Sequence, residues 1–281
     1  MKFNVTLIKP DNYIHSLALL EAAEYIDIRI KQCGYESSLT LNYLDPHKIN
    51  VIFCGHLMPN ELLKTNQKLI IFNSEQLCIE SAWTSANYKN LLANNYVWDY
   101  SRANLGKIQH SNTQLIDFYY SNQLNRLKIR KPPKYDLLFY GSINDRRKKI
   151  LDEITRKGLR LKVIFGMYGN ERDALLSESK AILNLHYYDS QIFQQIRAFY
   201  PLINQIPIIS ENFPIETAPD IYSEAVFTNG KELIEDYVAR ILGSFDFEAE
   251  AKIRTDKFKD TDIENQFSDL IESSLKQMIK S

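Results

Sequence analysis

The sequence predicts an α/β protein with two domains, in each of which helices cover a mostly parallel sheet. Short apolar runs rich in β-branched residues alternate with amphipathic segments along the chain, as in successive βα units. A basic segment with two adjacent prolines, 127–134, is poor in core residues and indicates a linker. With 281 residues the chain can form two medium domains. The expected division is 1–130, 131–255 and a C-terminal helical segment 256–281.

The composition excludes several classes of protein. The net charge of −1 is unlike that of a dedicated nucleic-acid binder, and no GxGxxG or P-loop motif is present. Three cysteines, Cys33, Cys54 and Cys78, have no metal-ligand spacing and indicate reduced thiols. The N-terminus turns polar too early for a signal peptide, and no apolar run approaches the roughly 20 residues of a membrane span. The expected location is the cytoplasm, with peripheral attachment at the inner membrane face left open.

Polar loops follow three of the strands predicted in the first half. The predicted strands are 3–8, 37–41, 51–54, 69–72 and a short buried one at 97–101, with a helix over 16–33. In parallel sheets ligands bind beyond the carboxyl ends of the strands, which singles out His15, His56 and Glu75. One of them could act as general base toward an acceptor hydroxyl. In the alternative, His15 caps its helix, His56 is solvated and Glu75 pairs with a basic neighbour.

A second βα series begins with the strand 135–140. It runs into Gly141 and Ser142 and then into a basic helix. Glycine and serine at this place let backbone amides approach a phosphate, and the start of the helix adds partial positive charge. Arg146 or Arg147 could then clamp a pyrophosphate. Many α/β proteins begin a unit in this way, so the motif gains weight only from the segment that follows.

The segment 180–211 organises the second half. It contains a strand, 181–185, a polar aromatic loop, a helix, 191–204, and a second strand, 207–210. Gln194 and Arg197 lie three residues apart, on one face of this helix near its start. An arginine there, beside a loop of hydroxyl groups, can hold a phosphate or a cluster of sugar hydroxyls. The alternative is a surface arginine on an ordinary βαβ unit.

The residues of this segment resemble those of a known family. The order N-L-H-Y-Y (184–188), I-F-x-x-x-R (192–197), helix and I-I-S-E (208–211) is similar to the nucleotide-sugar segment of GT-B glycosyltransferases. The nearest group is the glycosyl-transferase-group-1-like proteins of bacterial polysaccharide loci, which the N-S-E-Q-L and W-D-Y-S stretches of the first half also resemble. The resemblance implies two Rossmann-like domains facing a cleft, a C-terminal helix that crosses back to the first domain, and a last strand of the first half near 118–120.

The resemblance also implies roles for the two domains. The second domain would hold the nucleotide sugar and the first the acceptor. The expected donor-binding residues are Gly141, Ser142, Arg146, Arg147, Tyr168, Tyr187, Gln194, Arg197 and Glu211. The family commonly has glutamate at the position of Gln194. Glutamine can donate and accept hydrogen bonds there but supplies no negative charge.

The predicted function is transfer of a sugar from a nucleotide sugar to a hydroxyl of a glycan, a lipid-linked molecule or another acceptor. Helix dipoles and arginine charge can stabilise the leaving diphosphate, so neither a metal nor another cofactor is expected. Three alternatives stay open. A non-catalytic binder of sugar nucleotides is favoured by Gln194, and a glucosyltransferase for modified DNA would use the basic segments 128–134 and 146–149. A two-domain epimerase would share the architecture.

Overall fold

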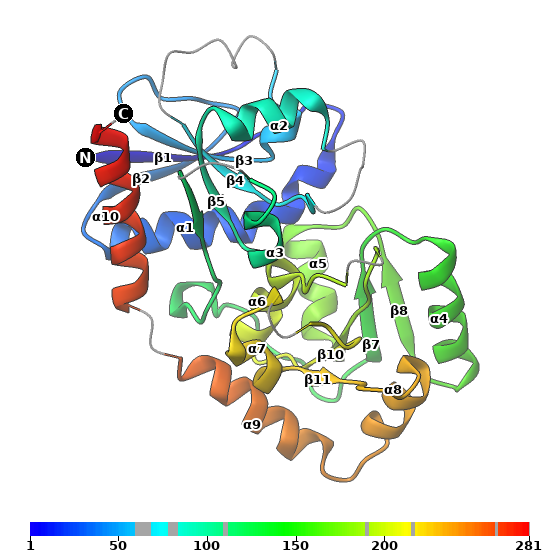
Figure 1. Cartoon of the computed structure of the whole chain (residues 1–281). Helices are drawn as coiled ribbons and strands as arrows, with labels where there is room; N and C mark the ends of the chain where they lie inside the picture. Colours follow the sequence, from blue (N-terminus) through cyan, green and yellow to red (C-terminus); the bar gives the residue numbers. More distant parts are fainter. Residues whose placement is uncertain are drawn as a thin grey trace. The chain divides into compact units, whose positions relative to one another are not determined.

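The chain forms two compact α/β units (Figure 1). The computed structural model describes residues 1–59, 69–77, 84–108, 112–188, 191–214, 217–261 and 264–280. The first unit consists of residues 1–118 and 262–281, and the second unit consists of residues 119–261.

The chain passes from the first unit to the second after residue 118 and returns after residue 261, whereas the predicted boundaries follow residues 130 and 255. The segment 119–130, which the sequence placed in the first domain, lies in the second unit. Its backbone is fastened there, because the amides of Arg126 and Leu127 both donate to Oδ1 of Asn204 at 2.8 Å. At the other end, the second unit extends to residue 261, since helix α9 (Phe247–Lys259) runs unbroken past residue 255.

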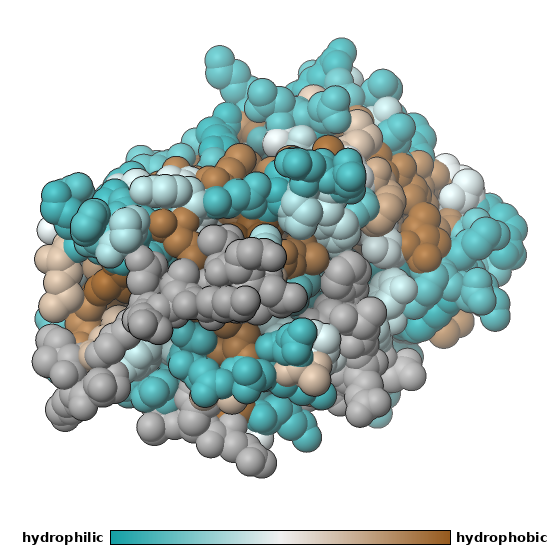
Figure 2. All heavy atoms as spheres, turned by 90° about the horizontal axis from the view of Figure 1, so that it is seen from above, coloured by the Kyte–Doolittle hydropathy of each residue, from teal (hydrophilic) through white to brown (hydrophobic). Residues whose placement is uncertain are grey.

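Hydrophilic side chains cover much of the described surface seen in Figure 2, and apolar ones gather in patches between them. The large apolar side chains exposed by more than a third are spread over both units; they are Met1, Ile14, Leu41, Tyr43, Ile129, Ile143, Phe165, Leu233, Phe245 and Ile253. Among the helices of the described ranges, none is long and apolar enough to cross a membrane.

The first unit is built on a six-stranded sheet in which every neighbouring pair is parallel. Its strands are β1 (Lys2–Leu7), β2 (Glu36–Leu41), β3 (Ile49–Phe53), β4 (Leu69–Asn73), β5 (Tyr96–Asp99) and β6 (Thr113–Leu115), in the order β2-β1-β3-β4-β5-β6. Its helices are η1 (Ile14–Leu19), α1 (Leu20–Gln32), η2 (Gly55–Leu57), α2 (Ala86–Ala93), α3 (Arg102–Leu105) and α10 (Glu264–Lys280), where η marks a 3-10 helix.

The C-terminal helix α10 belongs to the first unit, as the predicted return of the chain requires. The indole Nε1 of Trp98 donates to Oγ of Ser274 at 2.9 Å, and the ring of Phe267 meets that of Tyr25 edge to face at 6.5 Å. The predicted strand near 118–120 is wrong, because the last strand is β6. Phe118 is fully buried against the ring of Tyr25, so its apolar character comes from the core rather than from a sheet.

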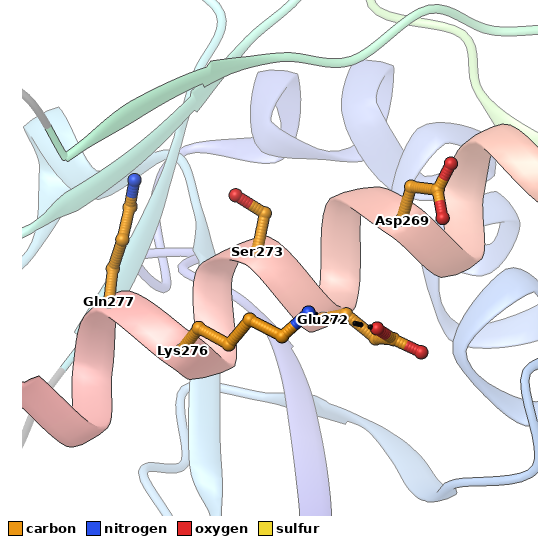
Figure 3. Close-up of a pocket in the computed structure, with 5 residues that line it drawn as sticks. All are labelled: Asp269, Glu272, Ser273, Lys276 and Gln277. Carbon is orange, nitrogen blue, oxygen red and sulfur yellow. Dashed lines mark hydrogen bonds and ion pairs between the residues drawn. The ribbon is translucent and has the colours of Figure 1, made fainter.

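An open hollow of about 400 Å³ lies along α10 (Figure 3). One helix supplies its lining, which consists of Asp269, Glu272, Ser273, Lys276 and Gln277. Two of these side chains pair with each other, since Nζ of Lys276 lies 3.2 Å from Oε2 of Glu272. The hollow contains none of the residues that the sequence singles out for a site.

The second unit is built on a five-stranded sheet whose neighbouring strands are also parallel. Its strands are β7 (Tyr135–Tyr140), β8 (Leu161–Ile164), β9 (Ser179–Asn184), β10 (Ile208–Ser210) and β11 (Phe227–Thr228), in the order β11-β10-β9-β7-β8. Its helices are η4 (Asn122–Leu124), α4 (Asp145–Arg156), α5 (Gly169–Ser177), α6 (Gln195–Ile203), α7 (Asp220–Ala225), α8 (Ile234–Leu242) and α9.

Both sheets have the same strand order. Numbered within each unit, the order is 2-1-3-4-5, and the first unit adds a sixth strand at the edge. Connections therefore leave in opposite directions from β1 and β3 in the first unit, and from β7 and β9 in the second. Ligands of open α/β sheets bind at such switch points, outside the carboxyl ends of the strands. The fold thus defines one candidate region in each unit.

One predicted helix begins later than its pattern suggests. The sequence favours a helix from residue 191, but α6 starts at Gln195. Gln191 has a φ of +52°, which a right-handed helix cannot contain, and the backbone amide of Phe193 donates to Oγ1 of Thr217 at 3.3 Å. Residues 191–194 therefore lie outside the helix and have no regular secondary structure. Helices α7 and α9 are additions that the sequence did not predict.

Candidate functional site

The switch point of the second unit begins with Gly141 and Ser142, directly after β7. Asn144 caps the helix that follows, since its Oδ1 accepts the backbone amide of Arg147 at 2.9 Å. The Nδ2 of the same side chain donates to the carbonyl oxygen of Tyr187 at 3.1 Å. Asn144 therefore joins the loop after β7 to the loop after β9.

Arg147 holds these two loops from inside. Its guanidinium is buried and donates to the carbonyl oxygens of Ser142 at 2.7 Å, of His186 at 3.2 Å and of Leu185. Burial is the main cause that lowers the pKa of Arg147 to about 9, and the nearby charge of Arg197 adds to it. Arg147 thus fixes the loops and places a positive charge beneath them.

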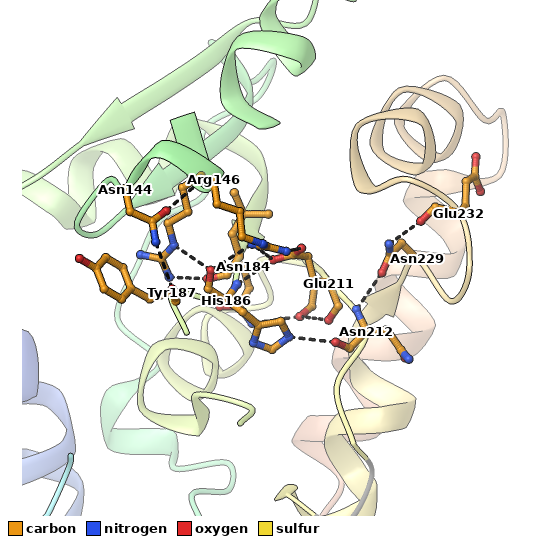
Figure 4. A network of polar contacts seen from close by, with 12 residues as sticks. Asn144, Arg146, Asn184, His186, Tyr187, Glu211, Asn212, Asn229 and Glu232 are labelled. Atoms are coloured by element: carbon orange, nitrogen blue, oxygen red, sulfur yellow. Dashed lines mark hydrogen bonds and ion pairs between the residues drawn. The ribbon is translucent and has the colours of Figure 1, made fainter. Parts of the chain in front are cut away.

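Arg146 faces the other way and forms a two-pronged ion pair with Glu211, the residue after β10 (Figure 4). Its Nη1 also donates to the carbonyl oxygen of His186 at 3.2 Å. The Glu211 carboxylate accepts the backbone amide of His186 at 2.7 Å, and Nε2 of His186 lies 2.9 Å from the carbonyl oxygen of Asn212. These contacts connect the carboxyl ends of β7, β9 and β10.

Arg197 reaches the same place from the first turn of α6. A Cβ atom on Gly141 would lie 2.9 Å from its Nη2 and 3.6 Å from Nη1 of Arg147. The loop can pass the guanidinium because position 141 is glycine, whose φ of +139° also disfavours other residues. The hydroxyl of Tyr140 donates to the carbonyl oxygen of Arg197 at 2.8 Å. Two arginine side chains therefore lie close together, although like charges repel.

The remaining predicted donor residues lie in loops that follow strands of the same sheet. Gln194 immediately precedes α6 and is partly buried, and Tyr168 precedes α5 after β8. The Tyr187 ring lies 5.0 Å from the Arg147 guanidinium. The sequence reasoning missed Asn144 and gave His186 no role. An asparagine three residues before Arg147 is a helix-start signal that could have revealed the first of these.

The candidate base in the first unit lies at the carboxyl ends of β3 and β4, next to the switch point of that unit. Oε1 of Glu75, after β4, is 3.6 Å from Nδ1 of His56, after β3. Burial raises the pKa of Glu75 and lowers that of His56 to about 4, so the imidazole is neutral at physiological pH. The Glu75 side chain is 23% exposed and that of His56 only 7%. Glu75 is therefore the member of the pair that is more accessible from solvent.

His15 is connected to this edge of the sheet by its contact with Tyr13. It stands in η1, and its ring meets that of Tyr13 edge to face at 5.2 Å. The pKa of Tyr13 is raised by burial first and then by the charges of Cys54 and Glu75. Loops after β1, β3 and β4 thus converge, as the sequence predicts from strand ends. Across the described ranges, no group of three or more His, Cys, Asp or Glu side chains could hold a metal ion.

Sequence comparison finds relatives in a virus, and no family model matches the chain. The uncharacterized protein L137 of Acanthamoeba polyphaga mimivirus is 30% identical over 206 residues, which cover 71% of this chain and 27% of L137. The uncharacterized protein R358 of the same virus is 30% identical over 189 residues, which cover 64% of this chain and 61% of R358. The chain spans about a quarter of the length of L137 and less than two thirds of that of R358.

Solved glycosyltransferase structures match nearly the whole chain. T4 phage BGT in complex with UDP and Mn²⁺ has a TM-score of 0.58 at 11% identity and covers 98% of this chain and 99% of its own. AviGT4, involved in avilamycin A biosynthesis, has a TM-score of 0.56 at 12% identity, with 99% and 97% covered. Anabaena HepE in complex with UDP and glucose has a TM-score of 0.54 at 11% identity, with 98% and 99% covered. The two parallel sheets thus form the two-domain, Rossmann-like GT-B fold, as predicted.

Proposed function

We propose that the chain is a glycosyltransferase that moves a sugar from a nucleotide-sugar donor to an acceptor hydroxyl. One observation carries the proposal: three arginines and the Glu211 carboxylate meet at the switch point of the second unit. Arg147 is buried, Arg197 lies beside it, and Arg146 is paired with Glu211. The excess of positive charge at two helix starts favours a ligand with two negative groups, such as a diphosphate.

The roles follow from the contacts. Arg197 binds the diphosphate and stabilises the charge that develops on it as its bond to the sugar breaks. Glu211 is held by Arg146 and by the His186 amide, and its carboxylate suits the hydroxyls of a ribose or sugar. Arg147 supports both loops from below. No metal is required by this scheme, because guanidinium groups and helix dipoles supply the charge.

In the first unit, Glu75 takes the proton of the acceptor hydroxyl while the acceptor oxygen bonds to the anomeric carbon. Burial raises the pKa of Glu75 toward neutral pH, which makes its carboxylate a stronger base. Glu75→Gln should leave the donor affinity unchanged and lower the rate of transfer about 100-fold or more, as loss of a general base does. A variant that transfers at the rate of the wild type would remove this role from Glu75.

The main test is calorimetric titration of the full chain with UDP-, GDP-, ADP-, dTDP- and CMP-sugars, in EDTA and again with Mg²⁺. We expect one nucleotide class to bind in EDTA and its sugar to be slowly hydrolysed. Binding without hydrolysis or transfer would indicate a non-catalytic binder. Binding that needs Mg²⁺ would contradict the metal-free scheme, and no binding in either buffer would overturn the proposal.

A further inference from the structure

A buried carboxylate in the first unit lies behind the loop that carries Glu75. Asp99, at the end of β5, is fully buried. Its Oδ2 accepts Nδ2 of Asn73 at 2.6 Å, and its Oδ1 accepts the backbone amide of Ser101 at 2.8 Å and Nδ2 of Asn104 at 3.2 Å. The donors that face Asp99 in these bonds are all neutral. Burial is the main cause that raises the pKa of Asp99 to about 7, and the hydrogen bonds from Asn73, Ser101 and Asn104 oppose this shift. Burying a carboxyl group in this way is costly, so the arrangement calls for an explanation beyond packing.

The two asparagines that bind Asp99 also form hydrogen bonds with the backbone of Glu75. Nδ2 of Asn73 and Nδ2 of Asn104 both donate to the carbonyl oxygen of Glu75, at 3.0 and 2.8 Å. The amide of Glu75 donates to Oδ1 of Asn73 at 3.1 Å, and the amide of Leu77 donates to Oδ1 of Asn104 at 2.9 Å. Both polar backbone groups of Glu75 are therefore fixed by these side chains.

Tyr88 closes the arrangement from α2. Its hydroxyl donates to Oδ1 of Asn73 at 2.8 Å, and its ring meets that of His56 edge to face at 5.7 Å. The network thus touches Glu75 through its backbone and His56 through packing. The orientation of each asparagine amide is fixed, because the backbone amides of Glu75 and Leu77 can only donate and therefore face Oδ1 of Asn73 and Asn104. Nδ2 of each asparagine then points to Asp99, which ties both side chains to the loop.

We propose that Asp99, Asn73 and Asn104 are positioning residues that hold the carboxylate of Glu75 in place for proton abstraction. The inference rests on the proposed function in one respect, the role of Glu75 as base. The three side chains contact no substrate; they act through the backbone of residues 75–77. An error of about 1 Å in the position of a catalytic group can slow a reaction about 100-fold, so such support has a measurable effect.

The test compares Asp99→Asn and Asn104→Ala with a control, Asn50→Ala, in the full chain. Asn50 is also fully buried in this sheet, and it holds another loop through Asp45, whose amide donates to its Oδ1 at 2.9 Å. In Asp99→Asn the new amide group meets the amide group of Asn73, and this bond is lost. Asn104→Ala removes the hold on the Glu75 carbonyl and serves as the second variant if Asp99→Asn does not fold.

We expect both test variants to keep the donor Kd within about twofold and to lower kcat about 10- to 100-fold with little change in the KM of the acceptor. The acidic limb of the kcat–pH profile should move to lower pH, because the freed carboxylate becomes better solvated. Asn50→Ala should change none of these quantities. A merely structural role would lower stability in all three variants and leave the profile in place.

A readout without turnover separates this inference from the proposed function. The side-chain carboxyl of Glu75 can be titrated by ¹³C NMR and assigned by its absence in Glu75→Gln. We expect its pKa to fall in Asp99→Asn and Asn104→Ala and not in Asn50→Ala. If the wild type binds no nucleotide sugar, the proposed function fails while this titration still decides the positioning. Unchanged kcat, pH profile and titration in the two variants would overturn the inference.

Discussion

Gly141 and Arg197 lie so close together that a single methyl group on the glycine would collide with the guanidinium. A Cβ atom there would be 2.9 Å from Nη2 of Arg197, although 56 residues separate the two positions in the chain. The position of the Arg197 guanidinium therefore depends on the absence of a side chain at Gly141. The short distance joins the loop after β7 to the arginine that the proposal assigns to the diphosphate.

Gly141→Ala should weaken donor binding about 10-fold, because the methyl group displaces Arg197 and the φ of +139° strains the loop. The matched control is Gly158→Ala, whose φ of +82° imposes backbone strain but whose Cβ would have nothing within 4 Å. Calorimetric titration with the donor gives the comparison. Equal loss of affinity in both variants would show that strain alone is responsible and that the guanidinium contact is unimportant.

Arg197→Ala should weaken nucleotide-sugar binding by about 1.5–3 kcal/mol, the usual loss for a charged hydrogen bond. Arg156→Ala serves as control. Arg156 is the last residue of α4, at the end opposite to Arg146 and Arg147. Its side chain is 66% exposed and pairs with Glu153 at 2.6 Å. The two affinities are measured by the same titration. An Arg197 variant that binds as tightly as the control, with its fold intact, would place Arg197 outside the donor site.

The pair Arg146–Glu211 should show measurable coupling. The Glu211 side chain is 10% exposed and that of Arg146 is 42% exposed, so solvent weakens the attraction, and we expect a coupling energy of about 1 kcal/mol. Urea unfolding of Arg146→Ala, Glu211→Ala and the double variant, followed by far-ultraviolet circular dichroism, completes the cycle. Strictly additive losses would mean that Glu211 is held by the His186 amide alone.

His56 should make the folded state sensitive to acid. Its folded pKa of about 4 lies below the ordinary value of 6.5, so the unfolded chain binds more protons between these values. The stability that His56 contributes is complete above pH 6.5 and is lost as the pH falls toward 4, by at most about 3 kcal/mol.

Glu75 acts in the opposite sense, since its raised pKa favours protonation of the folded state in acid. The difference between the wild type and His56→Gln therefore isolates the histidine, because Glu75 is present in both. We expect the stability of His56→Gln to fall less from pH 6.5 to 4. Parallel stability curves for the two proteins would contradict the shifted pKa.

Much of the site could be predicted because it follows from single strand ends. Gly141 and Glu211 directly follow strands of one sheet, and Glu75 comes two residues after a strand of the other. Parallel strands bring such positions to one edge of their own sheet. What each side chain does there depends on residues far along the chain. Arg146 and Arg147 are adjacent and of the same type, yet one reaches Glu211 and the other turns inward to backbone carbonyls. No sequence pattern distinguishes these two fates.

The support of Glu75 was hidden for a related reason. Asp99 stands in an apolar strand, where a carboxylate gives no sign of which partners surround it. Asn73 and Asn104 come from different elements, and only the fold brings their side chains together on Asp99. The misplaced strand near 118–120 has a simpler cause, since a buried aromatic residue such as Phe118 is equally common in a core without any sheet.

The last prediction concerns the attachment of α10 to the first unit. Trp98 is buried, and its indole Nε1 donates to Oγ of Ser274 at 2.9 Å. Ser274→Ala leaves this donor without its partner and should lower the free energy of unfolding by about 1–3 kcal/mol, the cost of an unsatisfied buried group. Tryptophan fluorescence during urea unfolding reports on this unit, because Trp98 lies in its sheet.

The neighbouring serine supplies the control for this measurement. Ser273 accepts Nε2 of Gln114 at 2.8 Å, but this hydrogen bond is exposed and water can replace it. Ser273→Ala should therefore change stability by no more than about 0.5 kcal/mol. If both serine variants lose the same small amount, the indole hydrogen bond contributes nothing specific. The helix would then be held by its apolar stripe alone, in which Phe267, Ile271 and Leu275 are buried.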